Sequence, residues 1–202
     1  MNVANGSIAM SLSEVEIFYA RSIADWRKWL AKNHLSKQAV WLVCYNKNSG
    51  KKSITWSESV EVALCYGWID SKKIKIDDQS THQFFSKRKA KSTWSKINKV
   101  KIARLIEEDL MTEAGYKSID IAKQNGSWTI LDSVEELIIP EDLHAALKSK
   151  SVASDFFEGL SRSSKKAMLQ WLVLARRPET RQKRIAEIIA CAAQKLKPKH
   201  LR

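Results

Sequence analysis

The stretch WIDSKKIKIDDQSTHQFFSKR, residues 68–88, decides the fold that the sequence predicts. Two extended segments, 68–76 and 81–88, flank the polar residues 77–80, and this arrangement indicates a β-hairpin. Side chains alternate along a strand, so Ile74 and Ile76 share one face of the first segment, while Lys73 and Lys75 share the other. An antiparallel pair of strands is therefore expected here.

Outward from the hairpin, the chain changes from strands to helices. The apolar run AVWLVCY, residues 39–45, is typical of a central strand, and residues 14–20 suggest another strand. A helix is expected from Ser22 to Asn33, and a second one with Ser57 as its N-cap and Gly67 as its stop. Helical periodicity then predicts segments over 95–111, 113–124, 141–148, 151–160, 163–175 and 178–193.

Because the strands cluster before residue 90 and the helices after it, we expect an α+β fold. It combines a small, mainly antiparallel sheet with helices in the N-terminal two-thirds and an all-helical C-terminal region. Residues 1–13 are expected to form a disordered tail, residues 14–135 an α+β domain, and residues 136–202 a helical region packed on it.

The charge of the chain is strongly positive. Its 202 residues include 35 Lys and Arg against 22 Asp and Glu, a formal net charge of +13. Such a surface attracts nucleic acid, anionic lipid headgroups or phosphorylated ligands, and it repels cationic peptides. The alternative is a lysine-rich surface that only keeps the protein soluble.

The compartment is predicted from absences in the sequence. Cys44, Cys65 and Cys191 have apolar or small neighbours and no CxxC spacing, which is typical of free thiols in a reducing compartment. No apolar run approaches the roughly 18 residues of a membrane span. The first residues lack the charged and apolar regions of a signal peptide, so a cytoplasmic location is expected.

Signatures of catalysis are weak. The sequence contains no P-loop, GxGxxG or GxSxG, and its four histidines are scattered, so neither a metal site nor a cofactor is expected. The best catalytic candidates are Asp70, which follows Trp68, and Arg88 on the partner strand. They would face a cleft beside Trp56 and Trp68, although a structural Asp–Arg pair is the favoured interpretation.

A basic segment follows the hairpin. No Asp or Glu occurs from Gln79 to Ile106. Free backbone N–H groups at a helix start bind anions, and hydroxyl groups and cations surround this start. An anion site is therefore predicted, and the residues of this site are Arg88, Lys91, Ser92, Thr93, Ser95 and Lys96. The alternative is a capped helix with solvated lysines. Trp94 would either stack on a base or pack into the core.

The strings ALCYGWIDSKKIKID and QFFSKRKAKSTWSKINK resemble the YdeI/OmpD-associated (OmdA) family, also called bacteriocin-protection proteins. The resemblance extends over residues 14–194 and includes the strings IPEDLHAAL and ARRPETRQKRI. It implies a link to protection against bacteriocins and antimicrobial peptides, and some relatives are placed with porins in the periplasm. It attaches no catalytic signature to the motif positions, which are Trp68, Asp70, Arg88, Trp94, Ser95 and Asn98.

Three functions follow from these observations. The first is a non-catalytic protein of this type, which binds a phosphate group, nucleotide or nucleic-acid backbone near Ser95, with Asn98 and Trp94 at the same site. The second is an enzyme that uses Asp70 and Arg88. The third is a protein-interaction module of the envelope stress response, which works through the helical C-terminal region. The sequence leaves the ligand and the oligomeric state open.

Overall fold

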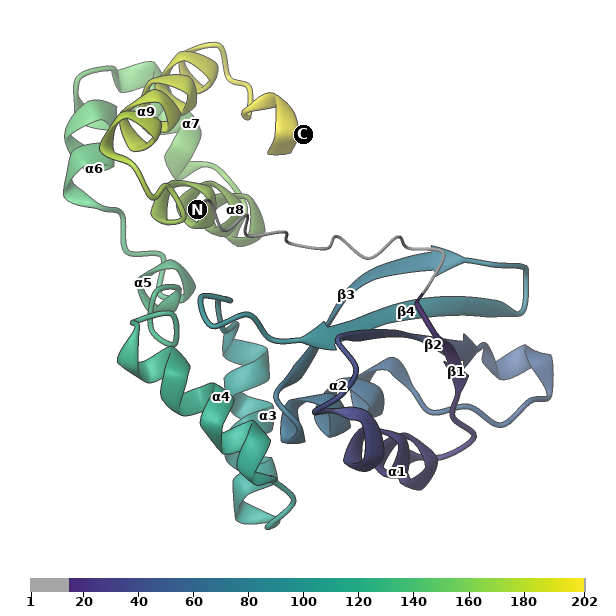
Figure 1. The fold of residues 1–202 in the computed structure, drawn as a ribbon. Helices are drawn as coiled ribbons and strands as arrows, with labels where there is room; N and C mark the ends of the chain where they lie inside the picture. The colour runs from purple at the N-terminus through teal and green to yellow at the C-terminus, as the bar shows by residue number, and fades with distance from the viewer. Residues whose placement is uncertain (1–14, 202) are drawn as a thin grey trace, which may run out of the picture. The chain divides into compact units, whose positions relative to one another are not determined.

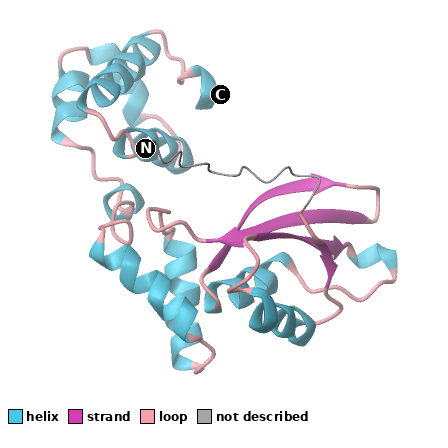
Figure 2. Ribbon diagram, viewed as in Figure 1, coloured by secondary structure: helices cyan, strands magenta, loops and turns pink. Residues whose placement is uncertain are grey.

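The computed structural model describes residues 15–201, which divide into two compact units. Unit 1 comprises residues 15–92 and 97–125, and unit 2 comprises residues 93–96 and 126–201. Every strand of the described chain lies in unit 1, and helices dominate the C-terminal region, which confirms the α+β fold (Figure 2). The boundaries at 14, 135 and 136 stay predictions, and the predicted tail at 1–13 lies outside the described residues.

Unit 1 contains a four-stranded sheet in the order β1-β2-β4-β3. The strands are β1 (Ile17–Tyr19), β2 (Ala39–Tyr45), β3 (Trp68–Lys75) and β4 (Ser80–Lys87). β1 pairs with β2 in parallel, whereas the β2–β4 and β3–β4 pairs are antiparallel. The hairpin predicted from residues 68–88 and the central strand predicted from residues 39–45 are both confirmed.

The register of the hairpin contains a bulge. Asp70 lies opposite Phe85, and Lys73 lies opposite Gln83, so β3 advances three residues while β4 advances two. An extra residue in one strand shifts the alternation of side chains. Asp70 and Lys73 therefore lie on the same face of the sheet, although their odd spacing would place them on opposite faces of a regular strand.

The helices that cover this face are α1 (Ile23–Asn33) and α2 (Trp56–Cys65) (Figure 1). Apolar aromatic side chains are large, and packing them removes much area from water. The ring of Trp26 in α1 lies 5.3 Å from Phe85, and that of Trp29 lies 5.9 Å from Trp68. The indole N–H of Trp26 donates to the carbonyl of Ser59 in α2, which links the two helices.

Local hydrogen bonds fix where these helices begin. Ser22 caps α1 as predicted, and its hydroxyl accepts the N–H of Asp25. The N-cap predicted for α2 at Ser57 is wrong, because Thr55 is the cap. The Thr55 hydroxyl accepts the N–H of Glu58, and the Glu58 carboxylate accepts the N–H of Thr55, a reciprocal pair that Ser57 cannot form with Val60.

The remaining elements of unit 1 are the 3-10 turn η2 (Lys47–Ser49), α3 (Lys96–Glu107) and α4 (Glu113–Gln124). α3 ends four residues before the predicted Met111, and Asp109 there has a left-handed backbone with φ of 52°. Lys96, the first residue of α3, belongs to unit 2, whereas the rest of the helix belongs to unit 1.

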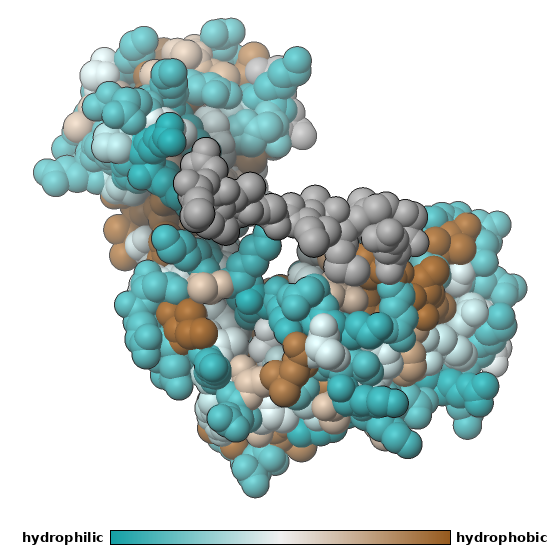
Figure 3. Space-filling model, in the orientation of Figure 1, coloured by the Kyte–Doolittle hydropathy of each residue, from teal (hydrophilic) through white to brown (hydrophobic). Residues whose placement is uncertain are grey.

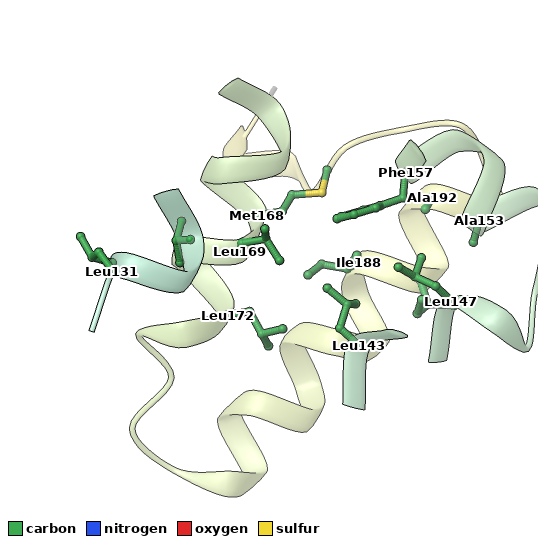
Figure 4. Packing of buried hydrophobic residues seen from close by; sticks show 12 residues of the cluster. Leu131, Leu143, Leu147, Ala153, Phe157, Met168, Leu169, Leu172, Ile188 and Ala192 are labelled. Carbon is green, nitrogen blue, oxygen red and sulfur yellow. The ribbon is translucent and has the colours of Figure 1, made fainter. Parts of the chain in front are cut away.

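Unit 2 is helical throughout its regular structure. Its helices are α5 (Asp132–Glu135), α6 (Glu141–Lys148), α7 (Ser151–Glu158), α8 (Arg162–Val173) and α9 (Pro178–Ala193), followed by η3 (Lys199–Leu201). Leu143, Phe157, Leu169 and Ile188 are fully buried at its centre (Figure 4). Pro178 occupies the first turn of α9, as the sequence predicts, where its missing N–H removes no helical hydrogen bond.

Among residues 15–201, no helix combines the length and the apolar character that a membrane span requires. The surface of unit 2 that is visible in Figure 3 is mostly hydrophilic. In the same view, apolar patches interrupt the surface of unit 1 where β3 and β4 lie in Figure 1. Ile74 in β3 and the following Ile76 are 40% and 49% exposed, respectively.

Candidate ligand pocket beside Trp56

The residues of the predicted anion site fall in both units. Thr93, Ser95 and Lys96 belong to unit 2, whereas the others belong to unit 1; these are Arg88, Lys91, Ser92 and Asn98. Lys91 and Lys96 are exposed, and the remaining residues of the set are half-buried. This site stays a prediction.

Within unit 2, a carboxylate of the protein engages the first residue of α3. Glu135 accepts a hydrogen bond from the backbone N–H of Lys96, and its Oε2 lies 2.6 Å from the Nζ of Lys166. The hydrogen bond from Lys166 is the main cause that holds the pKa of Glu135 below its ordinary value. The Nζ of Lys96 lies 3.4 Å from Glu136. An external anion at this N–H would therefore have to displace Glu135.

The aromatic residues proposed for a pocket differ in exposure. Trp94 is 1% exposed, and its ring centroid lies 5.0 Å from that of Trp128, so it packs inside unit 2 and cannot stack on a ligand there. Trp68 is also 1% exposed, and its indole N–H is buried without a hydrogen-bond partner among the described residues. Trp56 alone of the three is exposed, at 53%.

A chain of hydrogen bonds holds Trp56 at the surface of unit 1. Its indole N–H donates to Oδ2 of Asp70 at 2.8 Å. The side-chain amide of Gln83 lies 3.4 Å from the same oxygen, and it also donates to the carbonyl of Lys72 in the bulge at 3.2 Å. Gln83 is 3% exposed. A buried amide thus orients a carboxylate, which in turn orients an exposed ring.

The negative charge of Asp70 stabilises the charged form of Arg88. Burial lowers the pKa of Arg88 to about 10, while the negative charge of Asp70 acts in the opposite direction. The guanidinium therefore stays charged at neutral pH. This interaction fits a structural role for Asp70 in β3 and Arg88 directly after β4, and the role of either residue in catalysis stays a prediction.

A pocket of about 340 Å³ lies beside Trp56 in unit 1. Its volume falls in the range typical of small-molecule sites, roughly 300–1,000 Å³. Side chains from β2, the start of α2 and the hairpin line it, among them Cys44, Thr55, Trp56, Lys73, Thr81 and Gln83. Lys73 and Gln83 were not among the predicted site residues, and the lining includes neither Trp68 nor Arg88.

Two lysines and two aspartates line this pocket, so their formal charges sum to zero, but their partners differ. Lys75 forms an ion pair with Asp78 at 2.6 Å. Oδ1 of Asp77 accepts hydrogen bonds from the Ser80 hydroxyl and from the N–H groups of Gln79 and Ser80. Lys73 has no carboxylate partner within 4 Å among residues 15–201. Lys73 is therefore available to pair with an external anion, while Asp77 keeps its negative charge in the hairpin turn.

The thiol of Cys44 in this pocket is a poor nucleophile. Burial raises its pKa above the ordinary value, and the charge of Lys73 offsets only part of that rise. A thiol with a raised pKa is protonated at neutral pH, whereas the thiolate is the reactive form. Among the described residues, no group of three or more His, Cys, Asp or Glu side chains is arranged to hold a metal ion.

Unit 2 contains a separate groove of about 380 Å³ between α6 and α9. Small and apolar side chains form most of its lining, including Ala146, Ile185, Ala186 and Ala190. Lys150 lies at the same groove. Beside it, the guanidinium of Arg181 donates two hydrogen bonds to Asp142, at 2.6 and 2.8 Å, and this pair joins α9 to α6.

Comparison with protein families identifies the helical region. A family model described as "Bacteriocin-protection, YdeI or OmpD-Associated" (OmdA) matches residues 136–195, which include α6 to α9. Residues 136–195 therefore form an OmdA domain. This match confirms the resemblance for the strings IPEDLHAAL and ARRPETRQKRI, whereas ALCYGWIDSKKIKID and QFFSKRKAKSTWSKINK lie outside it.

A second model, "Domain of unknown function (DUF8412)", matches residues 18–118, half of the chain, so the chain belongs to that family. Searches of curated proteins and of solved structures gave no match. The motif positions Trp68 to Asn98 and the pocket beside Trp56 fall within residues 18–118. The description of bacteriocin protection therefore belongs to the OmdA helices, and the pocket belongs to the segment of unknown function.

Proposed function

We propose that this YdeI/OmpD-associated protein is a non-catalytic binding protein, which holds a small anionic ligand in the pocket beside Trp56. One observation carries the proposal. Lys73 has no carboxylate partner among residues 15–201 and lines a pocket of about 340 Å³ whose acidic residues are engaged in the hairpin turn. The net charge of +13 adds a long-range attraction for anions.

The contacts of Asp70 favour binding over catalysis. Oδ2 of Asp70 accepts the indole N–H of Trp56 and lies within 3.4 Å of the Gln83 amide. A general base must reach a substrate proton, and this oxygen is already engaged by two donors. The enzyme alternative, with Asp70 and Arg88 as catalytic residues, has less support because neither side chain lines the pocket.

The role in bacteriocin protection is part of the proposal. It is supported by the family description of residues 136–195. A protein with a net charge of +13 repels a cationic peptide, so direct capture of such peptides is not the expected mechanism. Protection would instead depend on an anionic ligand or partner that the protein binds in the cytoplasm, the compartment predicted from the sequence.

Titration with inorganic pyrophosphate, followed by two-dimensional NMR of the ¹⁵N-labelled full chain, tests the proposal. Saturable shifts are expected at amides of residues 44–46, 54–56 and 73–83, which line the pocket. Lys73→Glu should weaken binding at least about tenfold, because one charge pair becomes repulsive. Added salt should weaken binding further.

Lys117→Glu is the matched control, since it makes the same charge change on the exposed surface of α4 in unit 1. It should change pyrophosphate affinity by less than about twofold, because bulk salt screens distant charges. Absence of saturable shifts in the wild type would contradict the proposal. Equal losses in the two variants would also contradict it, because binding would then depend on net charge alone.

A further inference from the structure

Trp56 is exposed in a way that packing does not explain. It is 53% exposed, whereas Trp26, Trp68 and Trp94 are each at most 1% exposed. An indole contributes to stability mainly by leaving water, and this ring leaves only half of its surface covered. Its N–H is nevertheless held by Asp70 at 2.8 Å, so the direction of the ring edge is fixed.

The support behind Trp56 reaches into the interior of unit 1. Gln83, which is 3% exposed, bridges Asp70 and the bulge carbonyl of Lys72. Burying an amide is unfavourable unless its hydrogen bonds are made, and both contacts here come from the bulge region. This network leaves Trp56 half-exposed, so its physical effect is to orient the ring at the pocket.

The same bulge brings a cation to the oriented ring. It places Lys73 on the face that carries Asp70, and both Lys73 and Trp56 line the pocket. The ligand that satisfies both groups has an anionic group for the ammonium and a flat face for the indole. Thr81 and Asn46 line the same pocket; their donor groups bond to the carbonyls of Cys44 and Asp78, and their side-chain oxygens are acceptors for ligand hydroxyl or amino groups.

Resting on the proposed function, we infer that the pocket binds a nucleotide, with its base on the face of Trp56 and its phosphate at Lys73. Every nucleobase presents a π-face, so an aromatic platform of this kind binds bases with little sequence preference. A free mononucleotide and the end of a single-stranded nucleic acid present the same chemistry. A sugar phosphate lacks the base and is the competing ligand class.

The experiment compares four ligands on the full chain by NMR titration: AMP, ribose 5-phosphate, inorganic pyrophosphate and a ten-residue oligothymidylate. AMP is expected to bind roughly tenfold tighter than ribose 5-phosphate, because stacking on the indole is added to the phosphate contact. Trp56→Leu should reduce AMP affinity to that of ribose 5-phosphate and leave pyrophosphate affinity unchanged. Trp56→Phe, which keeps an aromatic face, should retain most of the difference.

The outcomes separate this inference from the proposed function. Equal affinities for AMP and ribose 5-phosphate, or equal losses for AMP and pyrophosphate in Trp56→Leu, would overturn the inference and leave anion binding in place. Failure of pyrophosphate and AMP alike would overturn both. Tighter binding of the oligothymidylate than of AMP, with the same dependence on Trp56, supports the inference and assigns the nucleotide to a nucleic-acid strand.

Urea unfolding of each Trp56 variant is the folding control. The half-exposed ring contributes little burial and one hydrogen bond to Asp70, so Trp56→Leu should stay folded and show only a small decrease in its unfolding midpoint. A variant that unfolds in buffer would show that the ring is structural, and the inference would then be wrong.

Discussion

Asp70 connects the interior of unit 1 to its surface. It lies on β3 opposite Phe85, accepts the indole N–H of Trp56, and lowers the energy of the positive charge on Arg88. Carboxylates with several donors around them are common structural elements, and their removal leaves the donors with weaker partners. Asp70 of the GWID motif therefore orients its neighbouring side chains, and this structural role explains its position without a catalytic one.

Asp70→Asn keeps the shape of the side chain and removes its charge. It should lower the free energy of unfolding by about 1 kcal/mol, because a neutral acceptor makes a weaker hydrogen bond. It should also increase the mobility of the Trp56 indole, which ¹⁵N relaxation of the Nε1 signal measures. Asp120→Asn, at an exposed position of α4, is the control and should change neither quantity. An unchanged Trp56 signal in Asp70→Asn would show that the ring is held in another way.

At the scale of elements, the start of α2 is stabilised by a reciprocal pair. Thr55 and Glu58 each accept the backbone N–H of the other. Thr55→Ala should lower the free energy of unfolding by about 1 kcal/mol, because the N–H of Glu58 loses its acceptor. Urea unfolding measures the change, and Thr55→Ser, which keeps the hydroxyl, should restore most of it. Equal losses in both variants would assign the effect to the methyl group instead.

The contact between α2 and α4 depends on a glycine. A Cβ on Gly115 would lie 2.4 Å from the carbonyl oxygen of Cys65 and 2.6 Å from the Cε of Met111. The same carbonyl accepts hydrogen bonds from the N–H and hydroxyl of Thr112, so it cannot move freely. The two helices can approach this closely only because residue 115 has no side chain.

Gly115→Ala should therefore lower the free energy of unfolding by about 1–3 kcal/mol, although alanine is the better helix former. Thermal or urea unfolding checks the value. Gly159→Ala is the control: φ there is −75°, and the nearest atom to a new Cβ is 3.4 Å away. That variant should be as stable as the wild type or slightly more stable. A stable Gly115→Ala protein would show that α2 and α4 can separate without loss.

At the scale of the whole molecule, several acids are held in their charged form by basic neighbours. The hydrogen bonds from Arg181 are the main cause that lowers the pKa of Asp142. Burial raises the pKa of Glu61, but hydrogen bonds and charges from Lys101 and Arg104 exceed this effect and lower it overall. A carboxyl group with a lowered pKa adds stability above its unfolded pKa, and that stability is lost as the pH falls through the folded pKa.

The free energy of unfolding should therefore decrease as the pH is lowered below about 4, where carboxyl groups ordinarily become protonated. Asp142→Asn should reduce this dependence, because one lowered pKa is removed. Urea unfolding at pH values from about 3 to 7 measures it. Glu141→Gln, at the neighbouring exposed position of α6, should leave the dependence unchanged. A pH dependence that is equal in Asp142→Asn and wild type would contradict the role given to the pair with Arg181.

The sequence by itself determined the fold class, the hairpin, the central strand, the α1 cap at Ser22, the start of α9 at Pro178 and the OmdA resemblance of the C-terminal region. These features depend on periodicity, caps and strings within a few residues of one another, so a single sequence carries them. Even the error at α2 was local, because Thr55 with Glu58 three residues later is a readable signal.

Only the tertiary structure decided the candidate site. Pairing with β4 introduced the bulge that places Asp70 and Lys73 on one face, and alternation along β3 alone predicts the opposite. Folding also brought Glu135 to the N–H of Lys96, at a helix start that looked open in the sequence. Both features depend on segments that are not adjacent in sequence, β3 with β4 in the first case and Glu135 with Lys96 in the second, and local patterns do not encode their strand register and packing.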